Sequence, residues 1–512
     1  MKRHAAILIP LFSLRAAGDL GRGEIGGLYP MAELALAMGH RMIQLLPVDE
    51  TAPGETSPYS AMSVLAIDPL YPTSAALPGV GPAALARARA AAGPGDPPDP
   101  IRLRAAKLDL LRQSFKHFQR RASARDRADF AAFVRAEQGW LADYALFRAL
   151  KERFRWAPWE AWPGGLAARE PRALQSATHE LAGEISFHSY VQFVAYRQWR
   201  AMRQALAARG VTLGGDLAFS PGRESAEVWA GQAAFDLART VGAPPDAFSA
   251  TGQRWGLPMP AWQAMRQGGL ALIRARIRRA RQLFDVLRID HVVGLYRTYG
   301  FGADPAAMGA FDPSEPSAQL AQGEELIRVM RAAAGAMDLL AEDLGVIPPF
   351  VRRSLAALGI PGYKVMRWER EWNAPGQPFI PPVSYPELSV ATTGTHDTET
   401  LAEWWRAAPA QERAAFVRMF GAAARLDARA PELDDRAGLA ILDALYAAGS
   451  ILTIAPVQDL FGWAARINVP GTVGGDNWQW RFPFPLEKAA ENPALAARVA
   501  AIRAIAERSG RR

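Results

Sequence analysis

The 512-residue sequence contains no cysteine. Disulfides, thiolate metal ligands and a cysteine nucleophile are therefore excluded, which agrees with a reducing compartment. No apolar run approaches the roughly 18 residues that a membrane-spanning helix requires, so we expect no membrane association. Residues 5–12 are apolar and follow Lys2 and Arg3, as in a signal peptide, but Pro10 interrupts them and no good cleavage site follows. We expect a strand there and a cytoplasmic protein.

Lysine is scarce, although the formal net charge is +8 and the pI is about 9.8. Arginine supplies nearly all of the positive charge, and it is scattered through Ala/Arg-rich segments among Asp and Glu. A nucleic-acid-binding surface more often has a block or stripe of basic residues. We therefore attribute the pI to the composition of the source genome and expect no nucleic-acid partner. The lysines are Lys2, Lys107, Lys116, Lys151, Lys364 and Lys488.

Short apolar runs alternate with long amphipathic segments, which is typical of parallel β/α units. Half of the residues are hydrophobic and 21% are charged, as in a folded protein. The pattern predicts an α/β fold, a (β/α)8 TIM barrel that forms a single catalytic unit over residues 1–512. The candidate strands are residues 6–10, 42–46, 211–214, 286–289, 339–343, 362–368, 388–393 and 451–454.

Two long insertions interrupt this alternation. Residues 72–185 are expected to form a mostly helical subdomain. Within it, the stretch at 78–100 is rich in Ala, Gly and Pro, which is typical of a linker or a surface excursion. Residues 217–261 are expected to be irregular lid and substrate-binding loops, because loops of this length are uncommon unless they form lids or binding walls. Residues 51–71, rich in Pro, Gly, Ser and Tyr, are also expected to be a loop.

The most informative stretch is 286–294, V-L-R-I-D-H-V-V-G. Its apolar positions suit a short buried strand, and Arg288, Asp290 and His291 lie at one end. Buried charges are costly unless they are paired, so the strand end is expected to open into an active site. A purely structural Arg–Asp pair explains this motif about equally well when it is considered alone.

Three carboxylates follow candidate strands, namely Asp290, Glu342 and Asp397. Glycoside chemistry requires one ionised carboxylate and one protonated carboxyl on either side of a bond. Asp290 is suited to be the nucleophile because Arg288 favours its ionised form. Glu342 follows an apolar run that would favour the protonated form, so it is the candidate acid/base. Asp397 would hold sugar hydroxyls and stabilise the transition state.

Histidine and aspartate at strand ends also build divalent-metal sites. However, no H-x-H or H-E-x-x-H spacing occurs, so we expect no metal site. The histidines are His4, His40, His117, His179, His188, His291 and His396.

A series of short motifs spans nearly the whole chain, and together they resemble the amylomaltases. These are the 4-α-glucanotransferases of glycoside hydrolase family 77, in the α-amylase clan. The motifs are S-P-Y-S (57–60), G-D (215–216), G-A-P-P-D-x-F (242–248), G-Q-x-W-G-x-P (252–258), R-I-D-H (288–291), A-E-D-L-G (341–345), P-G-Y-K-V (361–365), G-T-H-D (394–397), Q-D-L (458–460), R-I-N-V-P-G-T (466–472) and N-W-x-W-R (477–481).

The resemblance implies a retaining enzyme that moves α-1,4-glucan segments between maltooligosaccharides or to glucose as acceptor. It implies Asp290 as nucleophile, Glu342 as acid/base and Asp397 as transition-state stabiliser. No cofactor is implied, and we expect a monomer or a simple homo-oligomer. The candidate substrate-binding residues are Tyr59, Asp216, Trp255, Arg288, His291, His396, Asn468 and Pro470.

Aromatic residues of the long lid, Phe248, Trp255 and Trp262, are expected to stack on sugar faces and exclude water, with ordinary packing as the alternative. Two other functions stay open, an α-glucan hydrolase of the same clan and a non-catalytic glucan-binding protein.

The chain also departs from the family pattern in ways that affect the expected lid contacts and acceptor preference. The departures are Val292, Val293, Leu217, Ala218, Glu224–Glu227, Leu257, Pro260 and Thr398.

Overall fold

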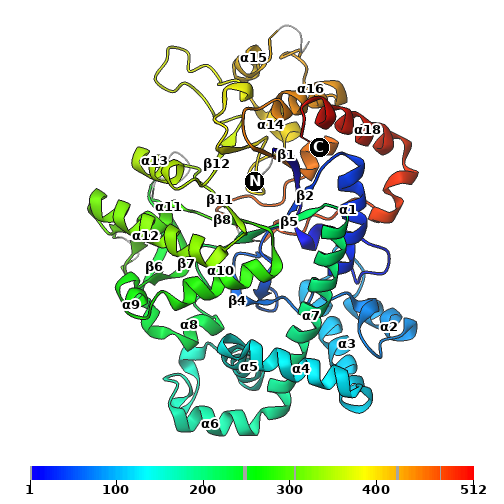
Figure 1. The fold of residues 1–512 in the computed structure, drawn as a ribbon, viewed down its shortest axis with the longest axis vertical. Coiled ribbons are helices and arrows are strands. Elements are labelled where there is room, and N and C mark those ends of the chain that lie inside the picture. Colours follow the sequence, from blue (N-terminus) through cyan, green and yellow to red (C-terminus); the bar gives the residue numbers. More distant parts are fainter. Residues whose placement is uncertain (1–2, 246–250, 305–306, 422–425, 473, 512) are drawn as a thin grey trace.

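The computed structural model describes residues 3–245, 251–304, 307–421, 426–472 and 474–511. Eight parallel strands close a barrel in the order β1, β2, β5, β8, β11, β12, β13, β14, and helices surround it (Figure 1). The strands are β1 (His4–Leu8), β2 (Met42–Gln44), β5 (Thr212–Leu217), β8 (Val286–Ile289), β11 (Asp338–Ala341), β12 (Gly362–Val365), β13 (Ser389–Thr392) and β14 (Leu452–Pro456).

Every strand expected from the alternation of apolar runs is a strand of this barrel, so the predicted (β/α)8 fold is confirmed. Residues 4–8, at the apolar run near the N-terminus, pair with β14 on one side and β2 on the other, which closes the barrel. The observed strands are shorter than expected at several ends. At β12, for example, the strand ends at Val365, three residues before the end of the expected 362–368 segment.

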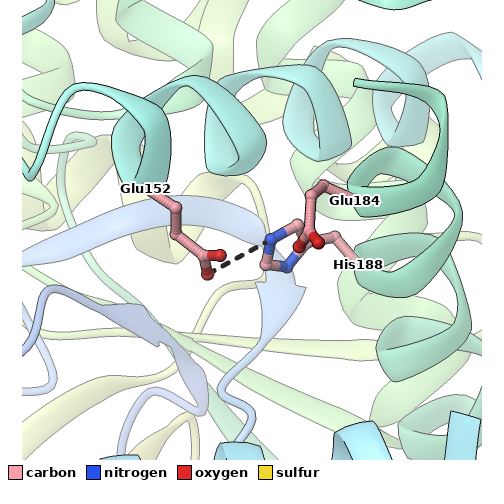
Figure 2. A group of neighbouring side chains, drawn as sticks. All are labelled: Glu152, Glu184 and His188. Carbon is pink, nitrogen blue, oxygen red and sulfur yellow. Dashed lines mark ion pairs between the residues drawn. The ribbon is translucent and has the colours of Figure 1, made fainter. Parts of the chain in front are cut away.

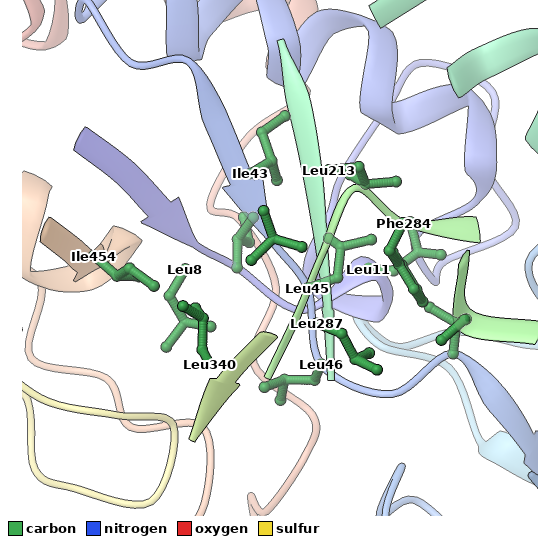
Figure 3. Close-up of a cluster of buried hydrophobic side chains, with 14 of the residues drawn as sticks. Leu8, Leu11, Ile43, Leu45, Leu46, Leu213, Phe284, Leu287, Leu340 and Ile454 are labelled. Carbon is green, nitrogen blue, oxygen red and sulfur yellow. The ribbon is translucent and has the colours of Figure 1, made fainter. Parts of the chain in front are cut away.

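Aliphatic side chains from the barrel strands and their loops form the core, as parallel sheets covered on both faces require. Figure 3 shows part of this cluster, with Leu8, Leu11, Ile43, Leu45, Leu46, Leu213, Phe284, Leu287, Leu340 and Ile454 labelled. In β5 the core leaves no room for side chains at two positions. A Cβ on Gly214 would lie 2.3 Å from Oε1 of Gln44, and one on Gly215 would lie 2.2 Å from the Phe284 ring.

Two small antiparallel sheets stand beside the barrel, and both replace segments that we expected to be irregular. The expected loop 51–71 contains most of a two-stranded sheet, β3 (Asp49–Thr51) and β4 (Ala61–Ile67), because A-M-S-V-L-A-I is a buried apolar run. The expected lid 217–261 contains the hairpin strands β6 (Phe235–Ala243) and β7 (Gln253–Pro260). These join β9 (Thr298–Phe301) and β10 (Ala310–Asp312) in a four-stranded sheet.

Helices dominate residues 82–208. They are α2 (Pro82–Ala92), α3 (Pro100–Arg121), α4 (Ala124–Ala136), α5 (Gln138–Arg153), α6 (Pro171–Glu180) and α7 (Ala182–Ala208). The stretch at 78–100, expected to be a linker, contains α2, because alanines outweigh the flanking prolines and glycines there. Local signals set helix boundaries in this region. Asp99 caps α3 by accepting from the Arg102 backbone N–H, and Pro100 occupies its first turn.

The remaining helices follow the barrel strands or line their loops. They are α1 (Leu28–Ala37), α8 (Ala226–Ala230), α9 (Trp262–Gln267), α10 (Ala271–Leu283), α11 (Val293–Tyr296), α12 (Pro316–Ala334), α13 (Pro349–Ala357), α14 (Leu401–Ala407), α15 (Ala410–Arg418), α16 (Asp435–Tyr446), α17 (Val457–Phe461) and α18 (Pro493–Arg508). Within the described ranges, none of the helices has the length and apolarity needed to span a membrane.

Substitution of Gly215 by alanine tests the close packing inside β5. The added methyl group would overlap the Phe284 ring, so we expect the free energy of unfolding to fall by about 1–3 kcal/mol, as for other overpacked cores. Gly183→Ala in α7 is the matched control, since no atom lies within 4 Å of its Cβ position. Urea titration should show that control unchanged or slightly stabilised, and equal destabilisation of both variants would contradict the packing argument.

Candidate active site

The acidic residues singled out in the sequence lie at the C-terminal ends of barrel strands, where barrel enzymes build their sites. In the parallel pairing of β8 with β11, Ile289 is opposite Ala341, so the next residues, Asp290 and Glu342, emerge side by side. In the pairing of β5 with β8, Asp216 is opposite Arg288. The barrel register thus brings together residues that are far apart in the sequence.

Arg288 connects two of these carboxylates. Its Nη1 donates to both oxygens of Asp216 at 2.8 Å and to Oδ1 of Asp290 at 2.7 Å. The Arg288 and Asp216 side chains are 7% and 0% exposed, whereas 23% of the Asp290 side chain is exposed. Burial opposes the charge of Arg288, but the two carboxylates outweigh it and raise the pKa of the guanidinium. Asp290 is therefore fixed through one oxygen at the edge of an ion-pair network.

Asp216 and Tyr59 form the buried side of this network. The Tyr59 hydroxyl donates to Oδ2 of Asp216 at 2.7 Å. Burial raises the pKa of Asp216, while the adjacent Arg288 charge opposes the rise. The Tyr59 ring stacks on the His396 imidazole, with centroids 5.2 Å apart and the planes 16° apart. Tyr59 thus links Asp216 with the loop that follows β13.

Glu342 accepts two backbone hydrogen bonds, from the His291 N–H to Oε2 at 2.8 Å and from the Leu344 N–H to Oε1 at 3.0 Å. His291 has a φ of 47°, in the left-handed region that non-glycine residues seldom adopt. Burial and then the negative charge of Asp290 raise the pKa of Glu342 to about 7, although Arg288 opposes this. Near neutral pH this carboxyl can therefore both give and take a proton.

Asp397 has the opposite environment. Its carboxylate lies 3.2 Å from Nε2 of His396 and accepts a hydrogen bond from Nδ2 of Asn468 at 2.6 Å. Burial opposes ionisation, but these two partners lower the pKa of Asp397 to about 2. The Asp397 side chain is 43% exposed, so it presents a negative charge to the barrel mouth.

The structure connects most of the predicted binding residues with this network. The Trp255 indole and the His291 ring pack nearly perpendicular to each other, with centroids 4.8 Å apart. Burial lowers the pKa of His291 to about 4, so its imidazole is neutral at pH 7. Pro470 is exposed on the loop that carries Asn468, and no polar contact joins it to Asp397 in the described part of the chain.

Of the three aromatic residues expected in the lid, Trp262 does not have the expected position. Trp262 is 6% exposed and donates to the Thr298 hydroxyl at 3.1 Å, so it packs in the core and does not stack on sugar. Phe248 lies outside the described residues. The departures Val292 and Val293 are also buried in the core, at 0% and 8% exposure.

Sequence reasoning assigned no role to Trp478 and Arg466, which also contact the site. The Trp478 ring lies 5.8 Å from those of Tyr59 and His396, and Arg466 donates to the Asp397 backbone oxygen at 2.9 Å. Both belong to quoted motifs, N-W-x-W-R and R-I-N-V-P-G-T, so the motifs contained the signal. A tryptophan and an arginine by themselves do not indicate a position in the active site.

One group among the described residues has the composition of a metal site, and it lies apart from the carboxylates at the barrel mouth. Glu152 of α5 and Glu184 and His188 of α7 have donor atoms within 4.8 Å of one another (Figure 2). However, Nη2 of Arg112 lies 2.9 Å from both glutamates, and Arg148 lies 3.6 Å from Glu152. The carboxylates of this cluster are therefore already paired with guanidinium groups, and Arg112 ties α3 to α5 and α7.

Comparison with known proteins identifies the family. The sequence model of glycoside hydrolase family 77, described as 4-α-glucanotransferase, matches residues 9–487. The chain belongs to this family. The resemblance inferred from the motifs is thus confirmed.

Relatives named as 4-α-glucanotransferases align with nearly the whole chain. The 4-α-glucanotransferase of Thermus thermophilus is 35% identical over 92% of this chain and 92% of its own length. That of Chlamydia caviae is 32% identical over 98% of this chain and 94% of its own. The solved amylomaltase of Streptococcus agalactiae in complex with acarbose has a TM-score of 0.85 and 27% identity, with full coverage of both chains.

The environment of Glu342 leads to a titration that spectroscopy can follow. We expect its carboxyl C=O infrared band to disappear around pH 7, and to be missing in Glu342→Gln. Asp290→Asn removes the neighbouring negative charge and should lower this pKa, whereas Asp397→Asn should leave it near 7. A Glu342 band that titrates near the ordinary glutamate value of about 4.3 would contradict the assigned environment.

Proposed function

We propose that this family 77 protein transfers α-1,4-glucan segments to the 4-hydroxyl of an acceptor sugar through a retaining double displacement, with Asp290 and Glu342 as the reacting groups. The observation that carries the proposal is the pair itself. Asp290 is partly exposed and bound to the Arg288 cation, while Glu342 emerges beside it with a pKa near 7. A retaining glycosidase needs an attacking carboxylate next to a carboxyl group that can donate a proton.

In the first step, Glu342 donates its proton to the glycosidic oxygen while an Asp290 oxygen attacks the anomeric carbon. The C1–O4 bond breaks and a C1–carboxylate ester forms, leaving a covalent glycosyl-enzyme. Arg288 holds Oδ1 of Asp290 and thereby fixes the direction of the attacking carboxylate. Asp397 is ionised because its pKa is about 2, and its negative charge stabilises the positive charge that develops on the sugar ring.

In the second step, Glu342, now ionised, removes the proton from the acceptor 4-hydroxyl. That oxygen attacks C1, the ester breaks, and both carboxyls return to their starting states. Maltooligosaccharides and glucose are the acceptors we propose. In each turnover Glu342 loses its proton in the first step and regains one in the second. A pKa of about 7 favours this exchange more than a value near 4.

Transfer requires that a sugar, and not water, reaches the covalent intermediate. Aromatic side chains beside the carboxylates support this selection. Tyr59 and Trp478 pack against His396 on one side, and Trp255 packs against His291 on the other. Such surfaces stack on the apolar faces of sugar rings and keep water out of a closed site. We propose that Trp255 and Tyr59 contribute to sugar binding in this way.

Product analysis with maltotriose tests the proposed reaction. We expect a ladder of shorter and longer maltooligosaccharides with no matching growth in reducing ends, and added glucose should shift the products toward short chains. Glu342→Gln keeps the side-chain shape and should lower the transfer rate about 10²–10⁴-fold, and Asp290→Asn by at least as much. Reducing ends that grow in step with cleavage would instead indicate a hydrolase, and full transfer by Asp290→Asn would refute the assigned nucleophile.

The pH dependence has a defined sign. The first step needs protonated Glu342, so kcat/KM should fall as the pH rises through about 7. Below pH 7 the limit comes from carboxylates that must stay ionised, and Asp397, with a pKa of about 2, should not contribute above pH 4. Initial rates of maltotriose transfer between pH 4 and 9 measure this profile. A rate that stays constant from pH 6 to 9 would contradict Glu342 as the acid.

A further inference from the structure

The loop that carries His396 and Asp397 joins β13 to α14, and buried groups from the segments that follow two other strands hold it. One of them is Asp459 in α17, directly after β14. It belongs to the Q-D-L motif, which the proposed chemistry does not use. Its side chain is inside the protein, with an exposure of 3%.

Asp459 binds both ends of this loop. Thr393 directly follows β13, and its hydroxyl donates a hydrogen bond to Oδ2 of Asp459 at 2.5 Å. Oδ1 of Asp459 accepts one from the backbone N–H of Leu401 at 2.7 Å, the first residue of α14. One carboxylate therefore fixes the distance between the start and the end of the segment on which Asp397 lies.

Arg367, which follows β12, holds the same loop from the other side. Its Nε donates to the Thr393 carbonyl at 3.1 Å, and its Nη2 donates to the Glu399 carbonyl at 2.7 Å and the Thr398 hydroxyl at 3.2 Å. Thr398 is a departure from the family pattern. Its hydroxyl also accepts from the Thr395 N–H at 2.9 Å, which closes the turn around Asp397.

The two charges depend on each other. Arg367 is 4% exposed, and burial of either ion by itself would be costly. Burial raises the pKa of Asp459, and the Arg367 charge opposes that rise. Arg367 also lies 3.7 Å from the carboxylate of Glu399, a side chain that is 48% exposed. Loss of the Asp459 charge would therefore leave the buried guanidinium with an exposed counter-charge in place of a buried one.

We propose that Asp459, together with Arg367, is a positioning residue that holds the 393–401 loop so that Asp397 and His396 face the reacting sugar. This inference rests on the role of Asp397 in the proposed function. Neither buried side chain needs to touch substrate. A loop displacement of about 1 Å lowers the rate of an oriented reaction by up to about 10²-fold, while binding of the glucan at other contacts is kept.

Asp459→Asn tests this with little change in shape. The amide keeps an acceptor for the Leu401 N–H but removes the charge opposite Arg367. We expect kcat for maltotriose transfer to fall about 10–100-fold, with KM within about twofold of wild type. Thr393→Val, which removes only the loop hydroxyl, should show the same pattern more weakly, and it serves if Asp459→Asn does not fold.

Asp285→Asn is the matched control. Asp285 also accepts from a backbone N–H, that of Leu213 at 2.9 Å, and pairs with Arg203, but it precedes β8 at the opposite end of the barrel. We expect Asp285→Asn to lower the melting temperature and to leave kcat unchanged. If the control lowers kcat as much as Asp459→Asn does, the effect is general destabilisation, and the positioning role is refuted.

A double-mutant cycle separates positioning from an independent effect. Because Asp459 is proposed to act through Asp397, adding Asp459→Asn to Asp397→Asn should lower the residual rate far less than it lowers the wild-type rate. Equal effects in both backgrounds would overturn the inference. If Asp397→Asn alone transfers glucan at the wild-type rate, the proposed role of Asp397 is wrong. This single variant therefore tests the proposed function separately from the role of Asp459.

Discussion

The active site depends on the ion pair between the Arg288 guanidinium and two carboxylates, Asp216 and Asp290. A buried arginine at this depth would be costly without both partners, and a second carboxylate beside Asp290 would be costly without the arginine. Together they place one negative charge at the edge of the barrel mouth with a fixed orientation. The other groups of the site are arranged around this charge.

The same charge separates the protonation states of the remaining carboxyls. Asp290 contributes to the raised pKa of Glu342, whereas His396 and Asn468 lower that of Asp397. Three carboxyls within one site would otherwise compete for ionisation. The backbone N–H groups of His291 and Leu344 hold Glu342 without supplying a full counter-charge, which allows its proton to be exchanged near neutral pH.

Arginine has a structural role throughout this chain. Arg148 pairs with Glu50 inside the protein, Arg279 lies over the Tyr196 ring, and Arg367 holds the loop after β13. Guanidinium groups with several donors satisfy carbonyls and carboxylates at once, which lysine does with less fixed geometry. Much of the charge behind the high pI is thus used within the fold and is not displayed as a basic surface stripe.

The sequence by itself determined the barrel strands and the identity of the acidic residues. Each strand is a short apolar run, Asp290 and Glu342 directly follow such runs, and Asp397 lies in the loop after another, so a local pattern suffices to find them. It did not reveal β4, β6 or β7. β4 pairs with the nearby β3 and β7 with the nearby β6, while β6 also pairs with the distant β9. The turn-rich composition around these strands hid them.

Only the tertiary structure decided which residues share an environment. The distance from Arg288 to Asp216, the two backbone donors on Glu342 and the contact of Trp478 with Tyr59 arise from barrel register and loop packing. The burial of Trp262 and the hydrogen bond of Asp459 with the loop after β13 have the same origin. Residue type sets what a side chain can do, but its pKa and its partners depend on neighbours that closure of the barrel brings together.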